Sequence, residues 1–259
     1  MVRPSALHST SPIDTTITTL DFQKGFRKLS DKTSSSPSGR HITHYKILAT
    51  DPDLSQILAR AITMPFTHSF SPMRWRTAVQ VMLEKEPGNP TISKLRVIQL
   101  LEADMNFAFC LLWGKRLVHH ALSHNALSPW NFGGRPGARV HSALLLKTIS
   151  YNYLRYTCQN AIIFDNDAKA CFDRIMPFLG LMATERLGMP QSATKSMLAT
   201  IKGMRFFIRT VHGISSSFYT STVVALILGI LQGSGAAPFI WLSLSCIFLQ
   251  ALHPHTTGF

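Results

Sequence analysis

The sequence is poor in carboxylates: it has only 13 Asp and Glu residues, and none of them follows Glu185. Lys and Arg together number 26, so the formal net charge at pH 7 is +13. This imbalance favours a polyanionic partner such as a nucleic acid, because basic side chains that neutralise phosphates release counterions. A basic surface alone specifies no particular nucleic acid, so the partner has to be inferred from motifs.

Cysteine is also scarce, and its spacing is irregular. The four cysteines form no C-x-x-C pair and no cluster with paired histidines: Cys110, Cys158, Cys171 and Cys246. We therefore expect no zinc site, and a reducing intracellular compartment, either the cytoplasm or the nucleus. Residues 1–40 lack the apolar core of a secretory signal and are rich in Ser, Thr and Pro. They are predicted to form a mobile leader that is ordered in part at most.

Long uninterrupted apolar runs are missing as well. Residues 210–259 contain no Asp, Glu, Lys or Arg, and both Thr222–Leu231 and Ala236–Leu252 are almost wholly apolar. The second run approaches the roughly 20 residues that span a bilayer. However, the Gly-rich stretch Gly229–Pro238 divides the region, so neither part has the length of a typical membrane-spanning helix. A membrane segment is not expected, although a non-enzymatic, membrane-associated protein stays open as an alternative.

The most informative segment that is present is Ile162–Ile175, I-I-F-D-N-D-A-K-A-C-F-D-R-I. An apolar strand, predicted at Asn160–Phe164, stops at two aspartates, and a helix is predicted at Ala170–Leu187. An Asp at the carboxyl end of a strand faces a cleft in α/β architectures, where ligands and metals bind. The interpretation without chemistry is a strand, an Asx turn and an Asp that caps the helix.

Two motifs make a catalytic interpretation possible. Asp167 is followed at +5 by Phe172 and at +6 by Asp173, and this spacing resembles the first catalytic motif of the reverse transcriptases, especially those of non-LTR retroelements. Gly229–Trp241, G-I-L-Q-G-S-G-A-A-P-F-I-W, resembles the family's later Q-G-x-x-x-S-P motif, with Ala237 at the usual Ser. Its glycines permit positive φ and close approach to a ligand.

Two further blocks follow the order of the family. Trp75–Lys85 and Leu95–Leu101 alternate like two strands around a turn, and they resemble the finger strands whose Lys and Arg hold the incoming triphosphate. The resemblance implies that Lys85 and Arg96 have this role. Phe132–Leu146 resembles the Gly-rich turn and helix between fingers and palm. Its Arg135 is expected to contact RNA or an RNA–DNA hybrid together with Lys85 and Arg96.

The resemblance implies an α+β protein with the right-hand fold of a reverse transcriptase. It implies a leader at 1–40, an N-terminal and finger region at 41–145 with an antiparallel strand pair, and an incomplete palm at 146–259, with the thumb absent. Periodicity predicts further helices and strands. The helices are expected at 41–68, 102–125, 142–159 and 191–203, and the strands at 204–211 and 217–219.

The reaction of the family is RNA-templated DNA synthesis from an RNA template, a DNA primer and dNTPs. It uses two Mg²⁺ ions held by oxygen ligands. The resemblance implies that Asp167 binds both ions, that the backbone carbonyl of Ala168 is a further ligand, and that Asp165 is the alternative metal ligand. The Phe172 ring would exclude a ribose 2′-hydroxyl, and Gln232 would contact the incoming nucleotide.

One element of the family's active site has no counterpart in the sequence. Reverse transcriptases carry a third palm motif with Asp-Asp, some tens of residues after the Gln-Gly turn, whereas no carboxylate follows Glu185 here. We therefore expect a reverse transcriptase fragment that is inactive by itself. A relic open reading frame with residual nucleic-acid binding is the alternative, and the sequence indicates no oligomeric state.

Overall fold

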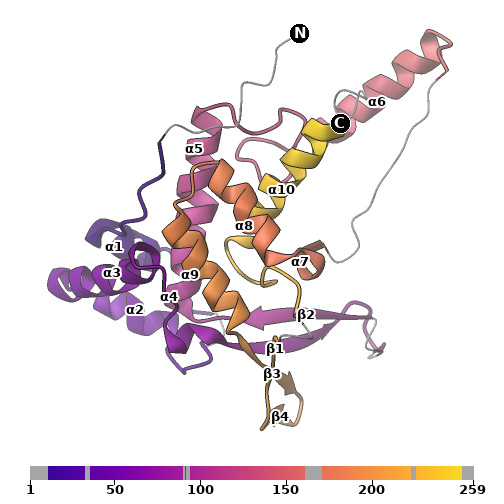
Figure 1. The fold of residues 1–259 in the computed structure, drawn as a ribbon. Coiled ribbons are helices and arrows are strands. Elements are labelled where there is room, and N and C mark those ends of the chain that lie inside the picture. Colours follow the sequence, from indigo (N-terminus) through magenta and orange to yellow (C-terminus); the bar gives the residue numbers. More distant parts are fainter. Residues whose placement is uncertain are drawn as a thin grey trace.

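The computed structural model of the chain describes residues 11–32, 36–89, 91, 94–160, 171–222 and 226–252. Most of its helices gather on one side of a small β-sheet, while one helix, α6, extends away from the rest (Figure 1). Of the strand predicted at Asn160–Phe164, only Asn160 lies within the described residues.

The N-terminal helices are α1 (Thr19–Arg27), α2 (Ile42–Leu48) and α3 (Pro52–Thr67). A capping box starts α1, since Thr18 and Asp21 satisfy each other's backbone N–H groups. Phe22 and Phe26 of α1 are fully buried, and the Phe26 ring stacks on Tyr45 with a centroid distance of 4.8 Å. This part of the predicted mobile leader is therefore packed into the core, because its two phenylalanines bury apolar area there.

The helical pattern predicted for residues 41–68 is broken in the middle. The side chain of Asp51 accepts a hydrogen bond of 2.9 Å from the Leu54 N–H and caps α3, and Pro52 occupies its first turn. An N-cap followed by Pro is a typical helix start, so α2 has to end before it.

The helix predicted at 102–125 is continuous and has three parts. They are α4 (Ala103–Leu111), a π-helical turn η3 (Leu112–Leu117) and α5 (Val118–Ser123). Trp113 of η3 lies in the core, with its ring centroid 5.5 Å from that of Phe109. Helix α3 packs against α4, and the C-terminal helix packs against η3.

After α5 the described chain forms further helices: α6 (Val140–Tyr156), which precedes the first predicted catalytic motif, α7 (Cys171–Arg174), α8 (Pro177–Arg186) and α9 (Gln191–Lys202). The single helix predicted at 170–187 is wrong, since α7 and α8 are separated at Met176, whose ψ is 116°. Pro177 causes the break, because proline disfavours the α conformation in the residue before it.

The sheet is mixed and consists of β1 (Thr77–Glu84), β2 (Leu95–Leu100), β3 (Arg205–Thr210), β4 (Gly213–Ile214) and β5 (Tyr219–Thr220). The order is β2-β1-β3-β4, and β5 also pairs with β3. A short 3₁₀ turn, η1 (Met73–Arg76), precedes β1. The antiparallel pairing predicted for the first two strands is present, with Glu84 opposite Leu95.

The parallel pairing of β1 with β3 was not predicted. It runs from Thr77 opposite Arg205 to Val81 opposite Arg209. The strands predicted at 204–211 and 217–219 therefore complete the sheet of the β1–β2 hairpin. Residues assigned to the palm region and to the finger region thus share one sheet.

The last described element is α10 (Ala237–Leu252), which packs against α8 and has Phe239, Ile240 and Leu242 in the core. The other apolar run, at 222–231, forms no helix among its described residues. Among the described residues, we find no helix with both the length and the apolar character needed to cross a membrane.

Candidate nucleotide-binding site

The Gly-rich turn before α10 has positive φ at Gly229, Leu231 and Gly233. Gly229 and Gly233 have φ angles of +111° and +115°. A Cβ atom on Gly233 would lie 2.6 Å from the carbonyl oxygen of Gln99, and one on Gly229 would lie 3.1 Å from the Cα of Asp173. The glycines therefore serve close backbone packing as well as positive φ.

Hydrogen bonds hold this turn between helix α7 and the edge strand β2. The Ile230 N–H donates to the Phe172 carbonyl at 2.9 Å, and the Gly229 N–H donates to the Ile175 carbonyl at 2.8 Å. On the other side, the Gln99 N–H donates to the Gln232 carbonyl at 3.0 Å. The structure thus brings two of the sequence-predicted site residues, Phe172 and Gln232, into one small region.

A residue that the sequence analysis missed fixes the far end of the turn. The side-chain amide of Asn106, on α4, donates to the Gly233 carbonyl at 3.3 Å, and its oxygen accepts from the Gly235 N–H at 2.7 Å. These contacts join residues more than 120 positions apart, so no local pattern could have identified Asn106. The turn is consequently anchored on α4, on α7 and on β2.

A set of polar side chains lies near the α7 side of the turn. Asp173 is exposed, but partial burial raises the pKa of its carboxyl group, and the nearby Lys85 ammonium opposes this rise. The hydroxyl of Tyr219 donates to the Gln80 side-chain oxygen at 2.5 Å. Burial raises the pKa of Tyr219, Gln80 opposes this, and the charge of Asp173 raises it further. The side chains of Gln80 on β1 and Asp173 on α7 therefore both influence the protonation of Tyr219 on β5.

The two basic residues predicted to hold a triphosphate lie on the β1–β2 hairpin. Lys85 directly follows β1, and its N–H donates to the Lys94 carbonyl at 3.0 Å. Arg96 is exposed and stands opposite Leu83 in the strand register. The two side chains are thus on neighbouring strands at the same end of the hairpin, and Lys85 is the one whose charge acts on Asp173.

Arg135 lies in a different part of the molecule from Lys85 and Arg96. Its guanidinium donates to the Ser128 carbonyl at 3.2 Å, within the loop between α5 and α6. The same loop approaches α10, since a Cβ on Gly134 would lie 3.6 Å from the Pro238 carbonyl. The described contacts of Arg135 are therefore structural ones within this loop.

The predicted metal ligands Asp165, Asp167 and Ala168 lie outside the described residues. In the described part of the chain, no group of three or more His, Cys, Asp or Glu side chains could hold a metal ion. Asp173 is the described carboxylate beside the Gly-rich turn. The predicted Mg²⁺ site therefore remains a prediction that depends on Asp165 and Asp167.

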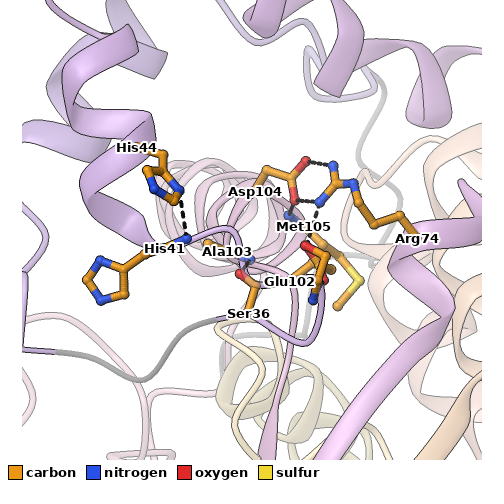
Figure 2. A network of polar contacts seen from close by, with 9 residues as sticks. Ser36, His41, His44, Arg74, Glu102, Ala103, Asp104 and Met105 are labelled. Carbon is orange, nitrogen blue, oxygen red and sulfur yellow. Dashed lines mark hydrogen bonds and ion pairs between the residues drawn. The ribbon is translucent and has the colours of Figure 1, made fainter.

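A buried ionic network fixes the start of α4, the helix that carries Asn106 (Figure 2). Arg74 donates to Glu102 at 2.6 Å and to Asp104 at 2.9 Å, and makes a second, shorter contact with Asp104. Glu102 also accepts from the backbone N–H and the hydroxyl of Ser38, at 2.8 and 2.9 Å. Burial by itself would lower the pKa of Arg74, but the two carboxylates hold it above its ordinary value.

Comparison of the chain with protein-family models and with curated proteins found no match. The family of the chain is therefore a matter of proposal, and its support comes from the motifs and from the geometry described above.

Proposed function

We propose that this chain is a fragment of a reverse transcriptase of the non-LTR retroelement type, with a nucleotide-binding site at the Gly-rich turn. The observation that carries the proposal is the hydrogen bond from Ile230 to Phe172. It joins the turn that contains Gln232 to the end of the Asp167–Asp173 motif. Two segments that resemble separate motifs of one active site are thus in direct contact, next to the charge of Lys85.

The proposed roles follow from the chemistry of each side chain. Lys85 and Arg96 are exposed cations at one end of the hairpin, where they can neutralise the phosphates of an incoming dNTP. The half-buried Gln232 presents an amide that can donate to and accept from a sugar or a base. The half-buried ring of Phe172 packs against the core and can exclude a 2′-hydroxyl by its bulk.

The metal chemistry is part of the proposal and rests on residues outside the described ranges. Two Mg²⁺ ions would supply charge stabilisation for the primer hydroxyl and for the leaving pyrophosphate. Asp167, the Ala168 carbonyl and, as the alternative, Asp165 would be the ligands from this chain. Asp173 is not proposed as their replacement, because burial raises the pKa of its carboxyl group and so disfavours the charged form that a metal ion needs.

We further propose that the chain does not extend a primer by itself. No carboxylate follows Glu185, so an Asp-Asp motif after the Gln-Gly turn is missing from the sequence. Loss of a principal metal carboxylate removes transition-state stabilisation that corresponds to about 10³-fold or more in rate. The expected activity is therefore binding of nucleotides and of RNA or an RNA–DNA hybrid without strand synthesis.

Primer extension on a poly-rA/oligo-dT template, with Mg²⁺ or Mn²⁺, tests the claim of inactivity. The chain and its Asp167→Ala variant should both fail to extend the primer. Extension by the chain that Asp167→Ala abolishes would contradict the inactivity and would support the family and the metal site at once.

Binding of a fluorescent dNTP tests the site itself. Lys85→Ala and Gln232→Ala should each weaken binding by about tenfold, the equivalent of one lost polar contact of about 1.4 kcal/mol. Lys195→Ala is the matched control, since Lys195 is an exposed lysine on α9. Equal affinity in all three variants and the unchanged chain, or no binding at all, would contradict the proposed site.

A further inference from the structure

Two histidines lie one helical turn apart at the end of α5, in a part of the molecule that the proposed nucleotide site does not use. His120 is in the last turn of α5, and His124 is the residue that caps its C-terminus. Their ring centroids are 4.2 Å apart, and the ring planes make an angle of 37°. Figure 1 shows α5 at the end of the molecule away from the sheet.

The spacing of this histidine pair suits a single metal ion. Side chains at positions i and i+4 of a helix lie on the same face. A zinc-sized ion lies about 2.0–2.1 Å from each imidazole nitrogen that binds it, so two ligating nitrogens are at most about 4 Å apart. Rings whose centroids are 4.2 Å apart can meet this limit with small rotations about their side-chain bonds.

The surroundings of both rings favour the form that binds a metal. The Nδ1 of His124 lies 2.9 Å from the carbonyl oxygen of His120, which can only accept a hydrogen bond, so Nδ1 carries the hydrogen. The lone pair of the neutral His124 ring is then on Nε2, and histidine ligands of metals are commonly oriented by such a contact. Burial, His124 and His119 together lower the pKa of His120, so its ring is neutral at pH 7.

A surface hollow of about 500 Å³ adjoins His120 and has room for the water ligands that complete the coordination of an ion. Lys115, Arg116 and Asp14 also line this hollow. The charge of Arg116 is compensated by Asp21 at 2.7 Å. A hydrogen bond from a backbone N–H is the main cause that holds the pKa of Asp14 below its ordinary value. Asp14 therefore stays negative and opposes the charge of Lys115.

We propose that His120 and His124 together bind one divalent late transition-metal ion, with water molecules as its remaining ligands. Imidazole suits Ni²⁺, Cu²⁺ and Zn²⁺, and the affinity of such a site rises from Ni²⁺ to Cu²⁺. Because only two side chains of the pair contribute, binding should be weaker than at a site with three protein ligands. Mg²⁺ prefers oxygen ligands and should not compete for the pair.

Isothermal titration calorimetry of the full chain with Ni²⁺ at about pH 7.5 tests the proposal. His120→Gln and His124→Gln should each weaken Ni²⁺ binding at least about tenfold, since even the loss of a residue that only orients a metal ligand costs about 10–100-fold. Binding by the unchanged chain should weaken as the pH is lowered through about 6, where imidazoles take up protons. An excess of Mg²⁺ should leave it unchanged.

His119→Gln is the matched control, because His119 is an exposed histidine on the same helix and adjacent positions of a helix do not face each other. It should bind Ni²⁺ as tightly as the unchanged chain does. The proposal is overturned if this control weakens binding as much as His120→Gln and His124→Gln do. It is also overturned if neither of those two variants weakens binding, or if the unchanged chain binds Ni²⁺ no more tightly than about 1 mM.

A second measurement needs no substitution and so does not depend on the folding of a variant. Ni²⁺ should slow the modification of His120 and His124 by diethyl pyrocarbonate, followed by mass spectrometry of the unchanged chain, and should leave the modification of His119 unaffected. Equal protection of all three histidines, or protection of none, would contradict a site formed by the pair.

The inference goes beyond the proposed function and does not depend on it. Lys85→Ala and Asp167→Ala should bind Ni²⁺ as the unchanged chain does, and His120→Gln should leave dNTP binding unchanged. A chain that binds Ni²⁺ through the histidine pair but binds no dNTP would support the inference and contradict the nucleotide site. Binding of dNTP without any Ni²⁺ binding would have the opposite meaning.

Discussion

Replacement of Arg74 by Met should destabilise this protein more than the loss of any surface ion pair does. The side chains of its two partners are buried, with Glu102 at 0 % and Asp104 at 5 % exposure. After Arg74→Met, Glu102 would keep its two hydrogen bonds from Ser38, but neither carboxylate would have a cationic partner in the network. Removal of one partner from a buried ion pair costs about 3–5 kcal/mol. This is a large share of the roughly 5–15 kcal/mol that stabilise a typical domain.

Urea unfolding monitored by tryptophan fluorescence measures this effect, because Trp75 is buried directly beside Arg74 in the sequence. Lys94→Met is the control, since its ion pair with Glu86 is about half exposed on both sides. Such a pair contributes about 0–1 kcal/mol, so the control should unfold at nearly the urea concentration of the unchanged chain.

A compensated variant separates charge burial from lost packing. Arg74→Met/Glu102→Gln/Asp104→Asn contains no uncompensated carboxylate and should recover part of the stability lost in Arg74→Met. A loss of stability in Arg74→Met no greater than in Lys94→Met would contradict a large cost of the unpaired buried carboxylates. Failure of the triple variant to recover any stability would show that the effect comes from packing of the Arg74 side chain.

Substitutions at Gly233, His120 and Asp173 should each change the stability of the chain. Gly233→Ala should lower the free energy of unfolding by about 1–3 kcal/mol and weaken dNTP binding, because the new Cβ would collide with the Gln99 carbonyl. Gly88 also has a positive φ, but a Cβ there would have no atom within 4 Å. In the same urea titration, Gly88→Ala should therefore lose less stability than Gly233→Ala. Burial and two neighbouring histidines lower the pKa of His120 below 6.5, so the unfolded chain binds a proton more readily. Stability should therefore fall as the pH is lowered through about 6.5, and His120→Gln should remove part of this dependence in urea midpoints measured at several pH values. Because the pKa of Asp173 is raised, its charged form is disfavoured in the fold, so Asp173→Asn should slightly stabilise the chain at pH 7. That gain in stability should disappear below about pH 4, where the carboxyl group is protonated in both the folded and the unfolded chain. If Asp173→Asn instead destabilises the chain at pH 7, attraction between Asp173 and Lys85 outweighs the cost of burial.

Several features of the fold and of the site could be predicted from the sequence, because they depend on neighbours along the chain. Alternation of apolar residues predicted the antiparallel β1–β2 hairpin, and helical periodicity predicted α9. The glycines at 229, 233 and 235 predicted a turn in which positive φ is permitted, and Gly229 and Gly233 have it whereas Gly235 does not. The effects of Asp51 and Pro177 on helix boundaries are local as well, and they were available to sequence reasoning although it did not use them.

Tertiary structure alone decided which of these segments meet. The parallel pairing of β1 with β3, the anchoring of the Gly-rich turn by Asn106, and the neutralisation of Glu102 and Asp104 by Arg74 all join distant parts of the chain. No local propensity encodes such contacts, because they depend on the path of the intervening helices and on how those helices pack. The residue types of the candidate site and the excess of positive charge are read directly from the sequence. The packing of α4, α7 and β2 around one turn determined that Phe172 and Gln232 lie together, while Arg135 lies apart.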